Sequence, residues 1–113
     1  MQTMSEIQEK IQAEFQRAEE ARAKGNEGQA RVCARRAAGI AIRDYLTRRG
    51  GTPPPSLSAM DLLTLLKDDP LLSLNLKLVA DHLTLRVTEE FKLPVDVDLI
   101  AEGRILCDEL LKA

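Results

Sequence analysis

The segment from Glu27 to Arg49 constrains the fold more than any other part of the chain. Its apolar residues recur at the three- and four-residue spacing of an α-helix and cover more than half of the helix circumference. Most of these residues are small. The full set is Ala30, Cys33, Ala34, Ala37, Ala38, Ile40, Ala41, Ile42, Tyr45 and Leu46. A helix with so wide an apolar surface is central to a bundle or buried at a dimer interface. Gly39, which costs about 1 kcal/mol relative to Ala inside a helix, indicates close contact with a neighbouring backbone.

The rest of the chain also has helical spacing, and no alternating pattern of useful length occurs. Besides 27–49, helices are predicted at about residues 5–24, 58–67, 70–91 and 96–111. Short links between long amphipathic helices favour antiparallel neighbours. We therefore expect an all-α, up-and-down helical bundle of four long helices plus one short helix, with residues 1–113 forming a single domain.

Residues typical of helix ends set these boundaries. The predicted N-caps are Ser5, Asn26, Ser58, Asp69 and Asp96. The Ser5 and Ser58 caps resemble capping boxes, because a Gln or Asp follows each three residues later. Gly25 supplies the left-handed residue that ends the first helix. Leu93-Pro94 ends the fourth helix after Phe91, because the residue before a proline is pushed out of the α region.

The composition argues against several classes of protein. A net charge of −2 is unlike the basic excess of general nucleic-acid binders, and 3% aromatic residues are few for stacking bases. No apolar run approaches the roughly 18–20 residues of a membrane span, so we expect no membrane partner. The first residues lack the apolar core of a secretory signal, which predicts a cytoplasmic protein.

Residues that could ligate a metal are scarce. The chain has two cysteines, Cys33 and Cys107, and one histidine, His82. A structural zinc site needs four ligands, so we expect neither a metal nor another cofactor. The cysteines could form a redox pair, but two small core residues are the favoured interpretation. Tyr45 continues the apolar surface of its helix, which predicts a core ring with its hydroxyl at the edge.

Several segments resemble HEPN domains. Residues 18–28 and then 30–39 are similar to the first two helices of that family, with the apolar-aromatic stretch 42–46 after them. Residues 96–110 look like its last helix, so the resemblance covers roughly Ser5 to Leu111. It implies a helical bundle that commonly dimerises. Many members partner a minimal nucleotidyltransferase, and others cleave RNA.

The ribonuclease members of that family carry an Arg followed, after roughly four to six residues, by a His. There the Arg binds phosphate and the His assists transfer of the ribose 2′-OH proton. In this chain Lys77 precedes His82 by five positions, and lysine lacks the planar fork that grips phosphate at two points. The resemblance therefore implies a degenerate, non-catalytic member. The alternative is a metal-independent ribonuclease, or an RNA- or nucleotide-binding protein, that uses His82 beside Lys77 or Arg86.

Four arginines of the small-residue helix are candidate partner- or ligand-binding residues: Arg31, Arg35, Arg36 and Arg43. They could bind phosphate or an acidic partner surface, and a basic groove along the last three would favour a nucleotidyltransferase subunit. The favoured alternative is pairing with acidic residues of neighbouring helices, such as Glu19, Glu20, Asp98 and Glu102. The preferred prediction is a protein-interaction or regulatory module that forms a homodimer, with a minimal nucleotidyltransferase as a further candidate partner.

Overall fold

The computed structural model describes residues 3–86 and 96–113, and these two ranges contain helices and no β-strand. The helices are α1 (Met4–Ala23), α2 (Glu27–Arg48), α3 (Ala59–Lys67), α4 (Leu74–Leu83) and α5 (Leu99–Lys112). The prediction of an all-α protein is confirmed. Within the described ranges, no helix combines the length and the apolar character needed to cross a membrane.

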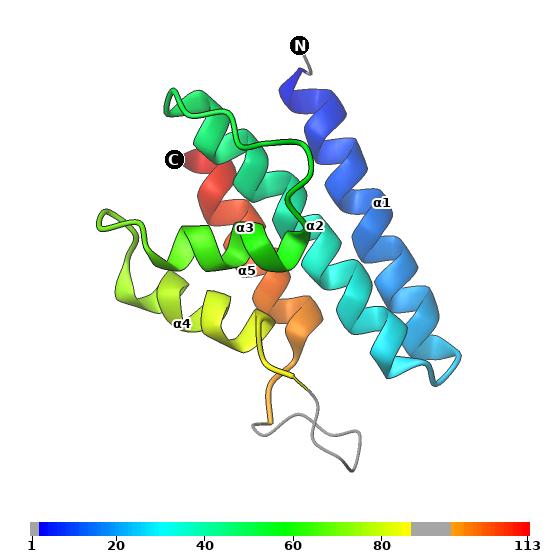
Figure 1. Cartoon of the computed structure of the whole chain (residues 1–113). Coiled ribbons are helices and arrows are strands. Elements are labelled where there is room, and N and C mark those ends of the chain that lie inside the picture. The colour runs from blue at the N-terminus through cyan, green and yellow to red at the C-terminus, as the bar shows by residue number, and fades with distance from the viewer. Residues whose placement is uncertain (1–2, 87–95) are drawn as a thin grey trace.

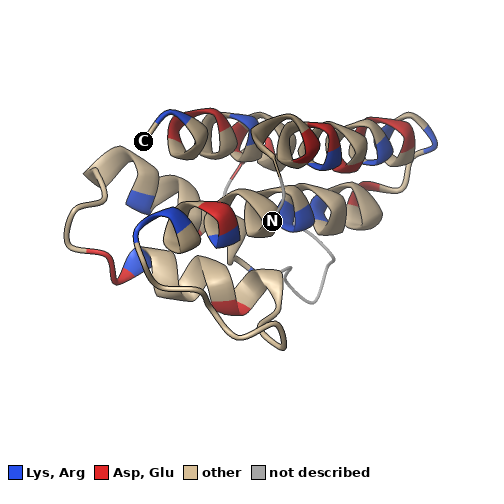
Figure 2. Ribbon diagram, turned by 90° about the horizontal axis from the view of Figure 1, so that it is seen from above, with Lys and Arg blue, Asp and Glu red and all other residues tan. Residues whose placement is uncertain are grey.

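Helix α2 is the central element of the fold. It lies antiparallel beside α1, and it also contacts α3 and α5 (Figure 1). Helices α3 and α4 form a smaller hairpin that is inclined to α2, and α4 packs against α5 (Figure 1). Charged residues of both signs gather along α1, whereas the part of the molecule around α3 is mostly uncharged (Figure 2).

The small residues of α2 lie in the core of the single chain. Ala34, Ala37, Ala38 and Ala41 have no exposed surface. A Cβ atom at Gly39 would lie 3.2 Å from the Cβ of Ala59, so the glycine allows the first turn of α3 to approach α2 closely. Of the two alternatives for this surface, the intramolecular core is therefore the one observed, and any dimer must use another face.

Three predicted helix ends are confirmed. Gly25 has a φ of 78° and follows α1 in the left-handed region. The side chain of Asn26 accepts a hydrogen bond from the backbone N–H of Gln29, 3.1 Å away, at the start of α2. Ser58 and Asp61 form the reciprocal hydrogen bonds of a capping box at the start of α3.

Three other boundaries were predicted wrongly. Helix α1 is capped by Thr3 instead of Ser5, and α5 by Asp98 instead of Asp96. Helix α4 is capped by Ser73, because the Asp69 carboxylate accepts hydrogen bonds from the N–H of Leu71 and from Tyr45 and so forms a turn. The long helix predicted at residues 70–91 is thus the 10-residue α4, and its expected end at Phe91 and Leu93-Pro94 lies outside the described residues.

Candidate functional site

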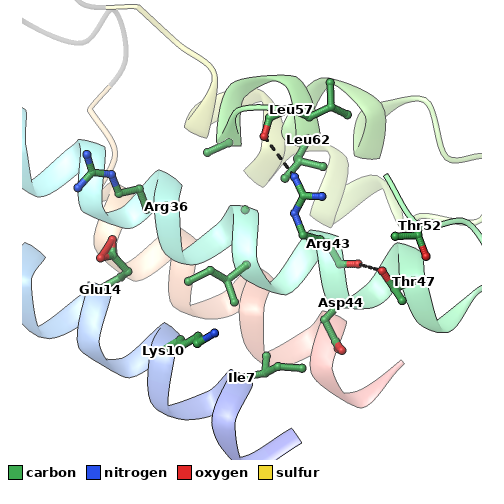
Figure 3. Close-up of a pocket in the computed structure, with 13 residues that line it drawn as sticks. Ile7, Lys10, Glu14, Arg36, Arg43, Asp44, Thr47, Thr52, Leu57 and Leu62 are labelled. Atoms are coloured by element: carbon green, nitrogen blue, oxygen red, sulfur yellow. Dashed lines mark hydrogen bonds between the residues drawn. The ribbon is translucent and has the colours of Figure 1, made fainter. Parts of the chain in front are cut away.

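Two of the four candidate arginines hold backbone carbonyl groups of other segments. In Arg35, Nε donates to the carbonyl oxygen of Leu83 at 2.7 Å and Nη2 to that of Leu85 at 3.0 Å, at the end of α4. Burial, together with the nearby charge of Arg31, lowers the pKa of Arg35. Arg43 donates to the carbonyl oxygens of Pro53, Pro54 and Leu57 at 3.0–3.2 Å and so holds the α2–α3 connection (Figure 3).

The expected pairing of these arginines with four acidic residues does not occur within the described ranges. Asp98 instead pairs with Arg22, Glu102 with His82, and Glu19 with Arg104, whereas Glu20 accepts from Gln16. Arg36 is exposed and Arg31 is partly buried, and neither forms a hydrogen bond or ion pair with another described residue. The structure therefore separates the predicted group: Arg35 and Arg43 are structural, and Arg36 is available on the surface.

His82 lies at the contact between α4 and α5. Its Nδ1 is 2.6 Å from Oε1 of Glu102, and both side chains are four-fifths buried. Lys77 lies five residues earlier on the same helix, which places it about 140° around the helix axis from His82. The two residues of the ribonuclease-like spacing therefore point in different directions from α4, and the contacts of His82 join two helices.

The remaining predicted residues occupy the core or its edge. Cys33 and Cys107 are both free thiols with 1% exposure, and burial raises the pKa of Cys107 to about 12. The ring of Tyr45 is buried, and its hydroxyl donates to Oδ2 of Asp69 at 2.9 Å, as expected for a core ring with a polar edge. Among the described residues, no three His, Cys, Asp or Glu side chains are grouped so that they could hold a metal ion.

A groove of about 640 Å³ lies over α2, between the first half of α1 and the segment that leads into α3 (Figure 3). Its apolar surface is formed by Ile7, Ile40, Leu57 and Leu62. Its polar residues are Lys10, Glu14, Arg36, Arg43, Asp44, Thr47 and Thr52. Two of the candidate arginines, Arg36 and Arg43, therefore line one groove together with Lys10, Glu14 and Asp44, whereas Arg35 is not among its lining residues.

Helix α4 carries an exposed row of leucines on its outer side. Leu74 is 83% exposed, Leu71 in the preceding turn is 74% exposed, and Leu78 one turn further is 53% exposed. The buried residues of α4, which are Leu76, Val79, Ala80 and Leu83, already supply its contact with the core. The row of Leu71, Leu74 and Leu78, called the α4 leucine row below, is therefore not needed to attach the helix.

Sequence reasoning missed both the α4 leucine row and Glu14. The spacing of residues 70–91 predicts one helix with a single buried side, and that pattern gives no sign of an exposed apolar row. Glu14 lies seven residues after Ile7 and four before Ala18, so its position on the buried side of α1 was readable from helical spacing. A carboxylate on the buried side of a helix marks a candidate functional residue, because unpaired acidic residues are rarely buried.

Neither protein-family models, curated proteins nor solved structures gave a match to this chain. The resemblance to HEPN domains stays a prediction that depends on the residues quoted above.

Proposed function

We propose that this chain is a non-catalytic, HEPN-like interaction module of the cytoplasm that pairs with a second copy of itself through the α4 leucine row. The observation that carries the proposal is the exposure of Leu74, Leu71 and Leu78, which the chain's own core does not use. Exposed apolar patches of this kind are typical of protein–protein contacts. The HEPN resemblance implies a dimer as well.

The spacing of the leucines favours a second copy as the partner. Leu71 lies three residues before Leu74, and Leu78 lies four residues after it. A two-fold axis near Leu74 therefore brings Leu71 of one protomer toward Leu78 of the partner subunit, so that the row is complementary to itself. The acidic residue next to the row, Asp81, has Lys67 of α3 at 3.4 Å, so its charge is compensated within the chain.

The solution mass of the protein, measured by light scattering over a wide range of concentrations, tests this proposal. We expect a dimer for the unchanged chain and a monomer for Leu74→Glu, because a carboxylate at the centre of the contact would lose its water. Ile105→Glu on α5 is the matched control, since Ile105 is also an exposed apolar side chain, and it should remain dimeric. A dimer that survives Leu74→Glu would refute the proposed face.

The ribonuclease alternative makes a separate prediction about His82. A general base must reach the proton that it removes, with a phosphate-binding cation beside it, whereas the side chain of His82 is four-fifths buried beside Glu102 and Lys77 points away from it around α4. We therefore expect no shortening of a mixed RNA at low salt, and the same result for His82→Ala and Lys77→Ala. RNA cleavage that is lost in His82→Ala would replace the interaction proposal with the enzymatic one.

A further inference from the structure

The two sides of the groove over α2 are held in place by packing and hydrogen bonds within the fold. Gly39 lets α3 approach α2, and the three hydrogen bonds of Arg43 hold the α2–α3 connection along one side of the groove. The opposite side is the first half of α1, which packs against α2 and buries Ile7 and Ile11 in the core. Both walls are thus fixed by the core, and the groove does not depend on the α4 leucine row.

One side chain of the groove has an unmet hydrogen-bonding requirement. Glu14 is 7% exposed, and its Oε1 pairs with Arg17. Its Oε2 is buried and has no hydrogen-bond partner among the described residues. A buried carboxylate oxygen without a partner is unfavourable, so a hydrogen-bond donor with a positive charge would be stabilised beside it.

Some of the other charged residues of the groove already have partners within the chain, and some do not. Asp44 is already paired with Arg48, whose Nε lies 2.8 Å from its Oδ2, and Arg43 is bonded to carbonyl groups. Arg36 and Lys10 are exposed and lie at the groove beside Glu14 (Figure 3). Neither donates to Oε2 of Glu14, which is left without a hydrogen-bond partner among the described residues.

We propose that this groove binds a segment of a partner polypeptide that carries a lysine or arginine between apolar residues, with the basic group pairing with the carboxylate of Glu14. The apolar stem of such a side chain, and its apolar neighbours, match Ile40, Leu57 and Leu62. The site deepens the proposed interaction function by naming the chemistry of a second partner on a different face.

The dimensions of the groove select a polypeptide over a small amine. The lining residues of α2 run from Arg36 to Thr47, which is about 16 Å of helix, and those of α1 run from Ile7 to Glu14, which is about 10 Å. A free alkylammonium ion would fill only the end near Glu14. A short segment of several residues fills the length and places a basic group at that end.

The test compares two short amidated peptides in which a central lysine, or a central norleucine, is flanked by leucines. Norleucine keeps the apolar stem and removes the ammonium group. Binding is followed by the backbone amide NMR signals of Gly39 and Ile40, with n-butylammonium as a third probe. We expect the lysine peptide to bind about tenfold or more tightly than the norleucine peptide, because the donated hydrogen bond is charge-assisted and sheltered.

Glu14→Gln should remove that preference, whereas Glu6→Gln, a change of an exposed acid on the same helix, should keep it. Equal affinity of the two peptides, or a preference that survives Glu14→Gln, would overturn the proposal. Binding of n-butylammonium as tight as that of the lysine peptide would assign the site to a small cation and overturn it too. All titrations are repeated with Leu74→Glu, so that loss of self-pairing and loss of groove binding are separate results.

Discussion

At the scale of single residues, three of the arginines of α2, Arg35, Arg43 and Arg48, donate hydrogen bonds to backbone carbonyl groups. The last carbonyls of a helix have no partner within it, and a guanidinium group has several donors in a fixed plane. Arg35 meets this need at the end of α4, and Arg48 donates to the carbonyl oxygens of Leu110 and Ala113 at the end of α5. Some basic residues of α2 therefore satisfy the free carbonyl groups at the ends of other helices and do not form a binding surface.

Arg35→Met should lower the free energy of unfolding by about 2 kcal/mol, because two half-buried carbonyl groups lose a charged donor. Arg36→Met is the matched control, since Arg36 is exposed, and should change stability by less than about 0.5 kcal/mol. Urea unfolding followed by circular dichroism measures both. Equal effects of the two substitutions would show that the carbonyl contacts of Arg35 do not stabilise the fold.

Two glycines should respond to the same substitution with opposite signs. A Cβ at Gly103 would lie 3.2 and 3.3 Å from two ring carbons of Phe15, which is 2% exposed, so Gly103→Ala should destabilise the fold by about 1–3 kcal/mol. A Cβ at Gly28 in the first turn of α2 meets nothing closer than 3.9 Å. Gly28→Ala should therefore stabilise by up to about 1 kcal/mol. Thermal melting of both variants measures the difference, and a stabilising Gly103→Ala would contradict the packing described.

At the scale of elements, one arginine connects three helices. Arg22 of α1 donates to Glu27 at the start of α2 and to both carboxylate oxygens of Asp98 at 3.0 and 3.2 Å. Asp98 in turn accepts from the N–H groups of Ile100 and Ala101 and caps α5. Arg22, followed by the backbone N–H groups, holds the pKa of Asp98 below its ordinary value of 3.8 despite partial burial.

The lowered pKa of Asp98 predicts how the stability of the fold depends on pH. The folded state favours the ionised carboxylate of Asp98. The contribution of Asp98 to the free energy of unfolding is therefore complete above the ordinary pKa of an aspartate, and it is lost as the pH falls through the lower pKa that Asp98 has in the folded state. Asp98→Asn keeps the cap but loses the ion pair, and should cost about 0.5–1 kcal/mol at neutral pH because Asp98 is half exposed. Asp98→Ala should cost about 1 kcal/mol more.

Thermal unfolding at neutral pH and at successive acidic pH values measures this effect. The difference between the unchanged chain and Asp98→Asn should shrink below about pH 4 and vanish in stronger acid. A difference that stays constant into strong acid would show that the pairing with Arg22 contributes nothing.

The elements also show what could and could not be predicted from the sequence. The positions of α1, α2 and α3 followed from apolar spacing and from short-range caps such as Asn26 and Ser58, because both are local. The start of α4 did not, because Asp69 is held by Tyr45, 24 residues away in the chain. The role of Arg35 was equally hidden, since its acceptors, Leu83 and Leu85, are brought to it only by the packing of α4.

At the scale of the whole molecule, the buried thiols report on opening of the fold. A thiolate is the reactive form of cysteine, and burial raises the pKa of Cys107 to about 12. We expect Cys33 and Cys107 to resist a thiol reagent such as Ellman's reagent in the native protein and to react fully in denaturant, since both are 1% exposed. Rapid labelling of the native protein would show that the core opens far more easily than this packing implies.

The measurement that tests the central claim most directly is disulfide cross-linking of Leu74→Cys. In the proposed dimer the two copies of this position meet at the two-fold axis, and the native cysteines are buried too deeply to compete. Mild oxidation should therefore give a covalent dimer of Leu74→Cys, and almost none of Ile105→Cys. No covalent dimer of Leu74→Cys, or equal amounts from both variants, would contradict self-pairing through the α4 leucine row.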